Sequence, residues 1–244
     1  MTDPLHSELP ILAILGGTGK EGPGLALRWA KVGYRVIVGS RQLEKAQATA
    51  TELNALLGTE TIRGLENTAA TREAEICVLT VVQAAHLPAL ESLKDVLPGK
   101  ILVDTTARVD FRDPRPPAPP SAARQAQDIL GPQVRVVAAF QNVPAHALKK
   151  NLGGSLDSEV LVCADDLLAA LAVIDLATAA GMRAHYAGNL DNAVVVEGLT
   201  AILISLNKQY AVKTAAIHVT GISPQGETAS PNGETANNPE GNPT

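Results

Sequence analysis

The stretch from Ile11 to Arg41, ILAILGGTGKEGPGLALRWAKVGYRVIVGSR, decides the fold. An apolar run at 11–15 leads directly into three spaced glycines, the glycines open a segment with helical periodicity, and a second apolar run follows at 35–39. This order of strand, glycine-rich turn, helix and strand is typical of a dinucleotide-binding βαβ unit, in which a pyrophosphate approaches the backbone amides at the helix N-terminus. The three glycines are Gly17, Gly19 and Gly22.

The end of the second apolar run selects the cofactor. An NAD-selective site usually has Asp or Glu there, about 20 residues past the glycines, to accept hydrogen bonds from the ribose 2'-hydroxyl. This chain has Ser40 and Arg41 instead, with Lys45 one helical turn further on. A guanidinium pairs with a 2'-phosphate, whereas a carboxylate would repel it, and cations near a helix N-terminus are otherwise unfavourable. The sequence therefore predicts NADP(H), and Thr18 and Lys20 of the glycine loop complete the predicted contacts.

Short, continuous apolar runs alternate with helical patterns along the first part of the chain. Such runs are typical of strands in a parallel sheet that helices cover on both faces. We therefore expect an α/β fold, a Rossmann-type doubly wound parallel sheet that forms an NADP-binding domain at 1–145. The runs lie near 11–15, 35–39, 75–82, 100–103 and 134–140.

The pattern changes beyond residue 145. A strand, a helix, a second strand and a long helical pattern follow, which predict a smaller C-terminal α/β domain at 146–220 that binds the acceptor. The long pattern near 189–210 is strongly apolar, so we expect it to be buried in the C-terminal core or in a homodimer interface. The tail at 221–244 is rich in Gly, Pro and Asn and is expected to be disordered.

Composition narrows the range of partners. With 2% aromatic residues and a formal net charge of -5, the chain lacks the stacking residues and the positive surface of a nucleic-acid-binding protein. Its two cysteines lie in apolar runs, which favours a reducing compartment. No secretory pattern opens the chain, and no uncharged apolar run reaches the roughly 18 residues of a membrane helix. We expect a cytoplasmic protein that binds small molecules, not nucleic acid or a membrane.

Two further loops are expected at the ligand crevice, because the carboxyl ends of parallel strands meet along one edge of a sheet. Val81 and Val82 end one apolar run, and 104–106 follows the next. The nicotinamide is expected near both loops. No nucleophile motif or metal-ligand spacing stands out, so no catalytic residue and no metal site is predicted. The scattered histidines are His86, His146 and His185.

Several motifs resemble those of the NADPH-dependent coenzyme F420 reductases, also called deazaflavin:NADP oxidoreductases. The likeness starts with the Gly-Gly-Thr-Gly opening and the Gly-Ser-Arg close of the stretch quoted above, and it extends over residues 10–220. A related NADPH-binding module also occurs in metalloreductases that carry a membrane domain. The further motifs are AEICVLTVV, SAARQAQDIL, VVAAFQNVPA, VLVCADD and AGNLDNAVVVEGLTAILISLN.

The resemblance implies an oxidoreductase that transfers a hydride between NADPH and the deazaflavin ring of coenzyme F420. Members of the family commonly have histidine where this chain has Gln141. The residues implied to hold the NADP phosphate are Thr18, Ser40, Arg41 and Lys45. The residues implied to lie near the deazaflavin ring are Gln141, Asn142, Val143 and Pro144.

Hydride transfer between two heteroaromatic carbons needs no side-chain acid or base, since the cofactors do the chemistry and the protein aligns them. Two alternatives stay open at this point. One is an NADPH-dependent reductase of another acceptor, such as a flavin or an imine, and the other is a non-catalytic NADP(H)-binding protein. The glycine fingerprint does not separate them, because a fold does not fix a function.

Overall fold

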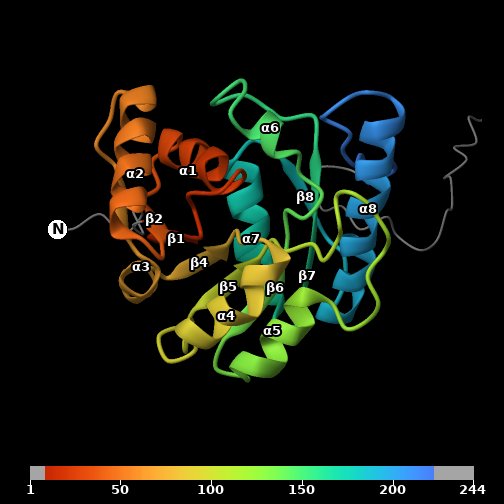
Figure 1. Ribbon diagram of the computed structural model, residues 1–244, viewed down its shortest axis with the longest axis horizontal. Helices are drawn as coiled ribbons and strands as arrows, with labels where there is room; N and C mark the ends of the chain where they lie inside the picture. The colour runs from red at the N-terminus through yellow and green to blue at the C-terminus, as the bar shows by residue number, and fades with distance from the viewer. Residues whose placement is uncertain (1–8, 223–244) are drawn as a thin grey trace, which may run out of the picture.

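An eight-stranded sheet forms the centre of the computed structural model, which describes residues 9–222 (Figure 1). Its strand order is β3-β2-β1-β4-β5-β6-β7-β8. The strands are β1 (Leu12–Leu15), β2 (Val36–Ser40), β3 (Ile62–Glu66), β4 (Ile76–Leu79), β5 (Ile101–Asp104), β6 (Arg135–Ala138), β7 (Glu159–Ala164) and β8 (Arg183–Tyr186). The helices are α1 (Gly22–Lys31), α2 (Leu43–Leu57), α3 (Asn67–Glu73), α4 (Gln83–Leu93), α5 (Ala122–Leu130), α6 (Ala145–Leu148), α7 (Leu167–Ala179) and α8 (Ala193–Gln209), with a 3-10 turn at Leu190–Asn192.

The direction of the strands confirms the predicted α/β fold with a Rossmann-type doubly wound sheet. Strand β1 pairs in parallel with both β2 and β4, so the sheet grows in opposite directions on its two sides. Parallel pairing continues to β6, whereas β7 runs antiparallel to β6 and β8 runs parallel to β7. The last two strands thus extend the same sheet. The division into domains at 1–145 and 146–220 stays a prediction.

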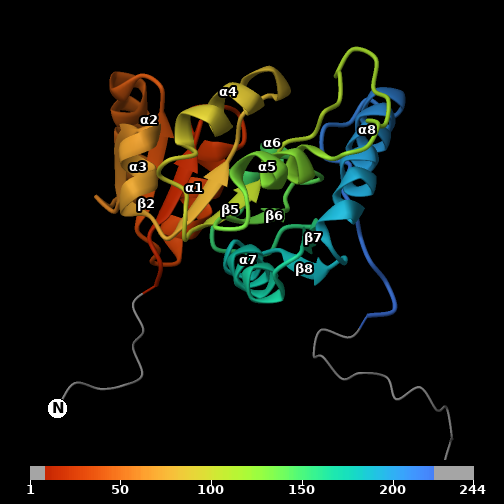
Figure 2. The ribbon, with the colours of Figure 1, turned by 90° about the horizontal axis from the view of Figure 1, so that it is seen from below.

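Alternate residues of the buried strands face opposite sides of the sheet. In β1, Leu12 and Ile14 pack into a core shared with α1, α2 and α7, while Ala13 and Leu15 pack into a second core shared with α3, α4, α5 and α8. Helices therefore cover both faces, which is what continuous apolar strands require. Figure 2 shows α2 and α3 at one end of the molecule and α8 at the other.

Strand β3 and the seven-residue helix α3 are not among the elements expected from the sequence. Strand β3 lies at the edge of the sheet and pairs with β2 alone, and Ile62 is its one buried residue. It therefore lacks the continuous apolar run that marks the central strands. Gly64 packs so closely against α2 that a Cβ there would collide with the backbone of Ala46.

Helix α8 is shorter than the helical pattern expected near 189–210, and it is apolar. In the part of the chain that the structure describes, Leu190–Gln209 is long and apolar enough to span a membrane, with a mean hydropathy of 1.4. One such helix is weak evidence for a span, and α8 carries the fully buried Glu197, paired with Arg108 at 3.0 Å. It packs against α5 and β7. The predicted disordered tail lies, from residue 223 on, outside the described residues.

A buried arginine ties α1 to the C-terminal segments. Arg28 is 2% exposed, burial lowers its pKa below the ordinary value, and within residues 9–222 it forms no ion pair. Its guanidinium instead donates to the carbonyl oxygens of Leu148 at 2.8 Å and Ala180 at 2.8 Å. Further acceptors are the carbonyls of Lys150, Asn151 and Gly154.

Candidate functional site

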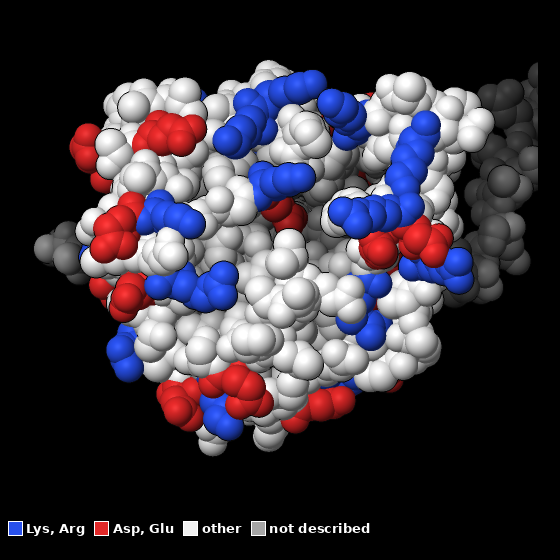
Figure 3. Space-filling view, viewed as in Figure 1, with Lys and Arg blue, Asp and Glu red and all other residues white. Residues whose placement is uncertain are grey.

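The loops predicted to bind the cofactor lie along one edge of the sheet. Because β1, β2, β4, β5 and β6 run parallel, the segments that follow them meet at the carboxyl ends of the strands. The strand order reverses between β1 and β4, and α/β sheets bind ligands in the crevice at such a point. Figure 3 shows a face of the molecule that is hollowed near its centre, with basic side chains around the hollow.

In the glycine loop, residues 16–22 between β1 and α1, a Cβ would collide with backbone atoms at two positions. A Cβ on Gly17 would lie 2.6 Å from a carbonyl oxygen of β1, and a Cβ on Gly22 would lie 2.6 Å from the Cα of Gly17. Gly19 differs, since it is exposed and its Cβ would meet nothing closer than 3.5 Å. The packing of α1 on β1 thus requires Gly17 and Gly22, whereas Gly19 leaves the loop open to a ligand. Thr18 is partly buried and Lys20 is exposed.

Two unpaired cations stand at the end of β2. The side chains of Arg41 and Lys45 are exposed, and among the described residues neither forms an ion pair. Ser40 is buried, and its hydroxyl oxygen accepts a hydrogen bond from the backbone N–H of Gln42 at 3.2 Å. The hydroxyl proton is therefore free to donate. Two cationic side chains and a free hydroxyl donor at one place are a suitable binding site for an anion.

A buried polar pair lies at the ends of β4 and β5. Nε2 of His86, in the first turn of α4, lies 2.6 Å from Oδ2 of Asp104, the last residue of β5, and both side chains are almost fully buried. The other Asp104 oxygen accepts a hydrogen bond from the N–H of Thr106 at 2.9 Å. Val81 packs against the glycine loop and Val82 is exposed. Asp104 is thus fixed by two hydrogen bonds at the crevice, although the spacing of these residues in the sequence did not reveal the pair.

Glu21 is a residue of this region that the sequence analysis did not single out. It immediately precedes α1, but its side chain does not cap that helix. Its Oε2 lies 3.0 Å from Oγ1 of Thr105, and its Oε1 is buried without a hydrogen-bond partner. Burial raises the pKa of Glu21 to about 8, and the contact with Thr105 offsets part of the rise. The sequence does contain a signal for Glu21, because an acidic residue is unexpected inside a loop that binds a pyrophosphate.

The loop at 140–144, between β6 and α6, is held by hydrogen bonds of its own buried side chains. Nε2 of Gln141 donates to the backbone carbonyl of Asp104 at 3.0 Å. Nδ2 of Asn142 donates to a carbonyl of α8 and to the hydroxyl of Thr200, each at 3.0 Å. The loop is therefore joined to β5 on one side and to α8 on the other.

The same loop combines an unusual backbone with unpaired polar atoms. Phe140 has a φ of 71°, in the left-handed region that non-glycine residues rarely adopt. Val143 packs into the core and Pro144 is partly buried. Oε1 of Gln141 and Oδ1 of Asn142 are buried without hydrogen-bond partners. Such atoms are costly unless a bound molecule or water satisfies them.

Among the described residues, His146 and His185 form no hydrogen bond with the side chains of this site. His146 is exposed on α6, and His185 on β8 lies 2.9 Å from the buried Glu159 of β7. Between residues 9 and 222, no group of three or more His, Cys, Asp or Glu side chains is arranged to hold a metal ion. Cys77 and Cys163 are buried and free.

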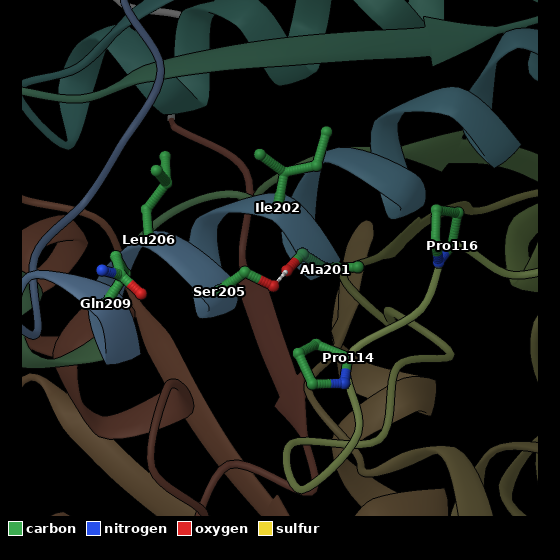
Figure 4. A pocket seen from close by; sticks show the side chains of 7 residues that line it. All are labelled: Pro114, Pro116, Ala201, Ile202, Ser205, Leu206 and Gln209. Carbon is green, nitrogen blue, oxygen red and sulfur yellow. Dashed lines mark hydrogen bonds between the residues drawn. The ribbon is translucent and has the colours of Figure 1, made fainter.

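A groove of about 300 Å³ lies elsewhere, between the proline-rich loop at 114–120 and α8 (Figure 4). It is mostly apolar and does not include any residue of the glycine loop or of the loop at 140–144. The site described above therefore rests on strand topology and polar contacts, not on the size of a cavity. The groove is lined by Pro114, Pro116, Ala201, Ile202, Ser205, Leu206 and Gln209.

Comparison with known proteins points to one family. The model of the family described as NADP oxidoreductase, coenzyme F420-dependent, matches residues 11–108. The F420-dependent NADP reductase of Methanocaldococcus jannaschii is 39% identical over 222 residues, which covers 86% of this chain and 98% of that protein. The enzyme of the same name from Methanothermobacter marburgensis is 37% identical over 229 residues, with the same coverage.

More distant relatives share the fold. A solved structure from Arthrobacter sp. FB24, described as a candidate F420-dependent NADP reductase, has a TM-score of 0.72 at 24% identity and covers 86% of this chain and 100% of its own. An imine reductase from Bacillus cereus has a TM-score of 0.59 at 18% identity, over 82% of this chain and 62% of its own. The metalloreductase STEAP3 of Rattus norvegicus is 31% identical over 81% of this chain, which spans 38% of that protein.

Proposed function

The chain belongs to the family of coenzyme F420-dependent NADP oxidoreductases, and on this premise we propose that it transfers a hydride between NADPH and coenzyme F420. The observation that carries the proposal is the likeness to two F420-dependent NADP reductases over 86% of this chain and 98% of each relative. That likeness spans nearly the whole of each relative. It is therefore not restricted to the glycine loop, which many unrelated dinucleotide-binding enzymes share.

We assign NADP(H) to the glycine loop and the end of β2. Gly17 and Gly22, where a Cβ would collide with backbone, bring the backbone amides at the start of α1 within reach of a pyrophosphate. The exposed cations Arg41 and Lys45 suit a 2'-phosphate. These features fit NADP(H) better than NAD(H), because no carboxylate stands at the end of β2. The residues assigned to this cofactor are Gly17, Thr18, Gly19, Lys20, Gly22, Ser40, Arg41 and Lys45.

We assign the two reacting rings to the neighbouring loops, with the nicotinamide near Val81 and Val82 and the deazaflavin near 141–144. The two cofactors supply the hydride donor and the hydride acceptor when both are bound. The part of the protein is to hold the reacting carbons roughly 3–3.5 Å apart and to exclude water. Unpaired buried oxygens of Gln141 and Asn142 support a ligand at the second loop, because a ligand donor would satisfy them.

The decisive experiment is to incubate the protein with NADPH and coenzyme F420, and to follow the absorbance of both. Parallel reactions contain FMN or a cyclic imine in place of F420. We expect turnover of F420 alone. Turnover of FMN or the imine without turnover of F420 would favour a reductase of another acceptor, and tight NADPH binding without any turnover would favour a non-catalytic binding protein.

We also propose a cytoplasmic homodimer. The buried, free cysteines are compatible with a reducing compartment. Helix α8 exposes Val195, Ile202 and Leu206, and the last two line the groove of Figure 4. A second copy of the chain would remove this apolar surface from water. Sedimentation equilibrium tests this, and a monomer at micromolar concentration would contradict it.

A further inference from the structure

Glu21 occupies a place where a negative charge would oppose a bound pyrophosphate. It lies in the glycine loop directly before Gly22, the first residue of α1. The pyrophosphate of the proposed cofactor approaches the backbone amides of this same loop. A carboxylate here would repel that anion through the poorly screened interior, whereas a neutral carboxylic acid would not.

The hydrogen atoms around Thr105 are compatible with a neutral acid at Glu21. Oγ1 of Thr105 lies 3.0 Å from Oε2 of Glu21 and 3.1 Å from the carbonyl oxygen of Leu79. A hydroxyl has one proton, so it cannot donate to both oxygens, and the carbonyl can only accept. When Thr105 donates to Leu79, its contact with Glu21 becomes a hydrogen bond if Glu21 carries the proton on Oε2.

The surroundings offer no cation to stabilise a charge on Glu21. Within residues 9–222 it forms no ion pair, and burial raises its pKa to about 8. Lys20, its neighbour in the loop, is exposed. Behind Thr105 the titratable and charged side chains already contact each other, as the pairs Asp104 with His86 and Glu197 with Arg108.

We propose that Glu21 binds the dinucleotide as a neutral acid. Its Oε2 hydroxyl donates to Thr105, and its carbonyl Oε1, which is buried and unpaired, accepts a hydrogen bond from a hydroxyl or amide N–H of the nicotinamide nucleoside. The inference rests on the proposed function, because it takes the dinucleotide to lie in this crevice. Glu21 would then make cofactor binding dependent on a proton that the protein itself carries.

The sign of the pH effect follows from this protonation state. Below pH 8 the acid is neutral and binding is unaffected by pH. Above pH 8 the free protein must take up a proton before it binds, so the apparent Kd rises by roughly tenfold between pH 7 and pH 9. NADH should show the same rise as NADPH, since both share the pyrophosphate and the nicotinamide nucleoside.

The experiment is titration calorimetry of the full-length protein with NADPH and with NADH, at pH 7 and pH 9, in buffers of different ionisation enthalpy. We expect the tenfold rise in Kd and an uptake of about one proton per dinucleotide at pH 9. Glu21→Gln should bind with a Kd that does not change with pH and without proton uptake, because its amide donates to Thr105 and accepts at Oε1 as the neutral acid does. Glu91→Gln, an exposed residue of α4, is the matched control and should behave as the wild type does.

Two results would overturn the role of Glu21. One is a wild-type Kd that is the same at both pH values, and the other is a Glu21→Gln protein with the wild-type pH dependence. Failure to bind either dinucleotide at any pH would instead overturn the proposed function. These failures are distinguishable, since the first two require binding.

The protein without cofactor provides an independent measurement. The unfolded carboxyl loses its proton near pH 4.5 and the folded one near pH 8, so wild-type stability falls as the pH rises through this interval. Glu21→Gln removes this fall. Urea unfolding at pH 5 and pH 8 should therefore show that the variant gains stability over the wild type at the higher pH, and a constant difference would contradict the neutral acid.

Discussion

The glycine loop and the loop at 140–144 contribute to the same crevice but are built in opposite ways. The first owes its shape to side chains that are missing, because a Cβ on Gly17 or Gly22 would collide with backbone. The second owes its shape to side chains that are present and buried, because Gln141 and Asn142 donate to other elements. A local sequence pattern therefore specifies the first loop, and the assembled fold specifies the second.

This difference has a functional consequence. Gly17 and Gly22 shape the glycine loop within the βαβ unit, although Gly16 and Glu21 also hydrogen-bond to Asn67 and Thr105. The proposed NADP(H) site should therefore be less sensitive to changes elsewhere in the chain than the other loop. The loop at 140–144 depends on β5 and α8, 37 and 54 residues away along the chain. The proposed acceptor site should therefore respond to substitutions far from the acceptor.

The strongest test of this independence is Arg28→Met. Arg28 lies on the helix that starts at the glycine loop and binds carbonyls that follow the other loop. Loss of the guanidinium leaves the buried carbonyl oxygens of Leu148 and Ala180 without this donor, and each costs about 1–3 kcal/mol, so the free energy of unfolding should fall by about 2–6 kcal/mol. Urea unfolding measures this. Lys31→Met, an exposed change on the same helix, should alter stability by less than about 0.5 kcal/mol, and equal effects would show that Arg28 is not a link.

Arg41→Ala tests the glycine-loop region alone. Loss of a charged donor to the 2'-phosphate should cost about 1.5–3 kcal/mol of NADPH affinity. The affinity for NADH, which has no 2'-phosphate, should stay the same, and so should the KM for coenzyme F420. Fluorescence titration with both dinucleotides measures the difference, and equal losses would place Arg41 outside the phosphate site.

Two glycine substitutions separate packing from ligand approach. Gly22→Ala should destabilise the protein by about 1–3 kcal/mol, because the new Cβ would lie 2.6 Å from the backbone of Gly17. Gly19→Ala, whose Cβ meets nothing within 3.4 Å, should keep the wild-type Tm and yet weaken NADPH binding. Thermal unfolding with and without NADPH distinguishes the two effects. Unchanged binding by Gly19→Ala would mean that the dinucleotide does not approach the loop there.

Asn142→Ala is the corresponding test in the loop at 140–144, and of these test variants we expect it to have the smallest effect on stability and binding together. Removal of its amide breaks two hydrogen bonds to α8, with a cost of about 1–2 kcal/mol in stability. The KM for coenzyme F420 should rise while the Kd for NADPH is retained. Steady-state kinetics with both substrates measures this, and a loss of NADPH affinity of similar size would show that the two loops are not independent.

The parts of the fold that sequence predicted are those specified by neighbouring residues. The strand at 11–15, the glycine turn and the helix that begins at Gly22 follow from local spacing. The same holds for α5, since Ser121 directly before it accepts a capping hydrogen bond from the N–H of Arg124. Strand β3 was not predicted, because an edge strand with one buried residue has no continuous apolar run. The hydrogen-bond partners of Gln141, Glu21 and Arg28 were not predicted, because they lie far away along the chain and only the folded structure brings them close. Sequence spacing contains no information about such contacts.

The hydrogen bonds of Arg28 also determine when α1 can complete its packing during synthesis of the chain. Its acceptors lie between 120 and 152 residues further along the chain. At a synthesis rate of about 5–20 residues per second, the ribosome needs roughly 8–30 s after Arg28 emerges to deliver the last of them. During that interval the βαβ unit carries a cation that cannot yet be buried with partners, so α1 cannot reach its final packing before α7 is made. In a fragment that stops at residue 145, Arg28 would remain without these carbonyl partners. We expect this fragment to become soluble and ordered only when the rest of the chain is supplied separately.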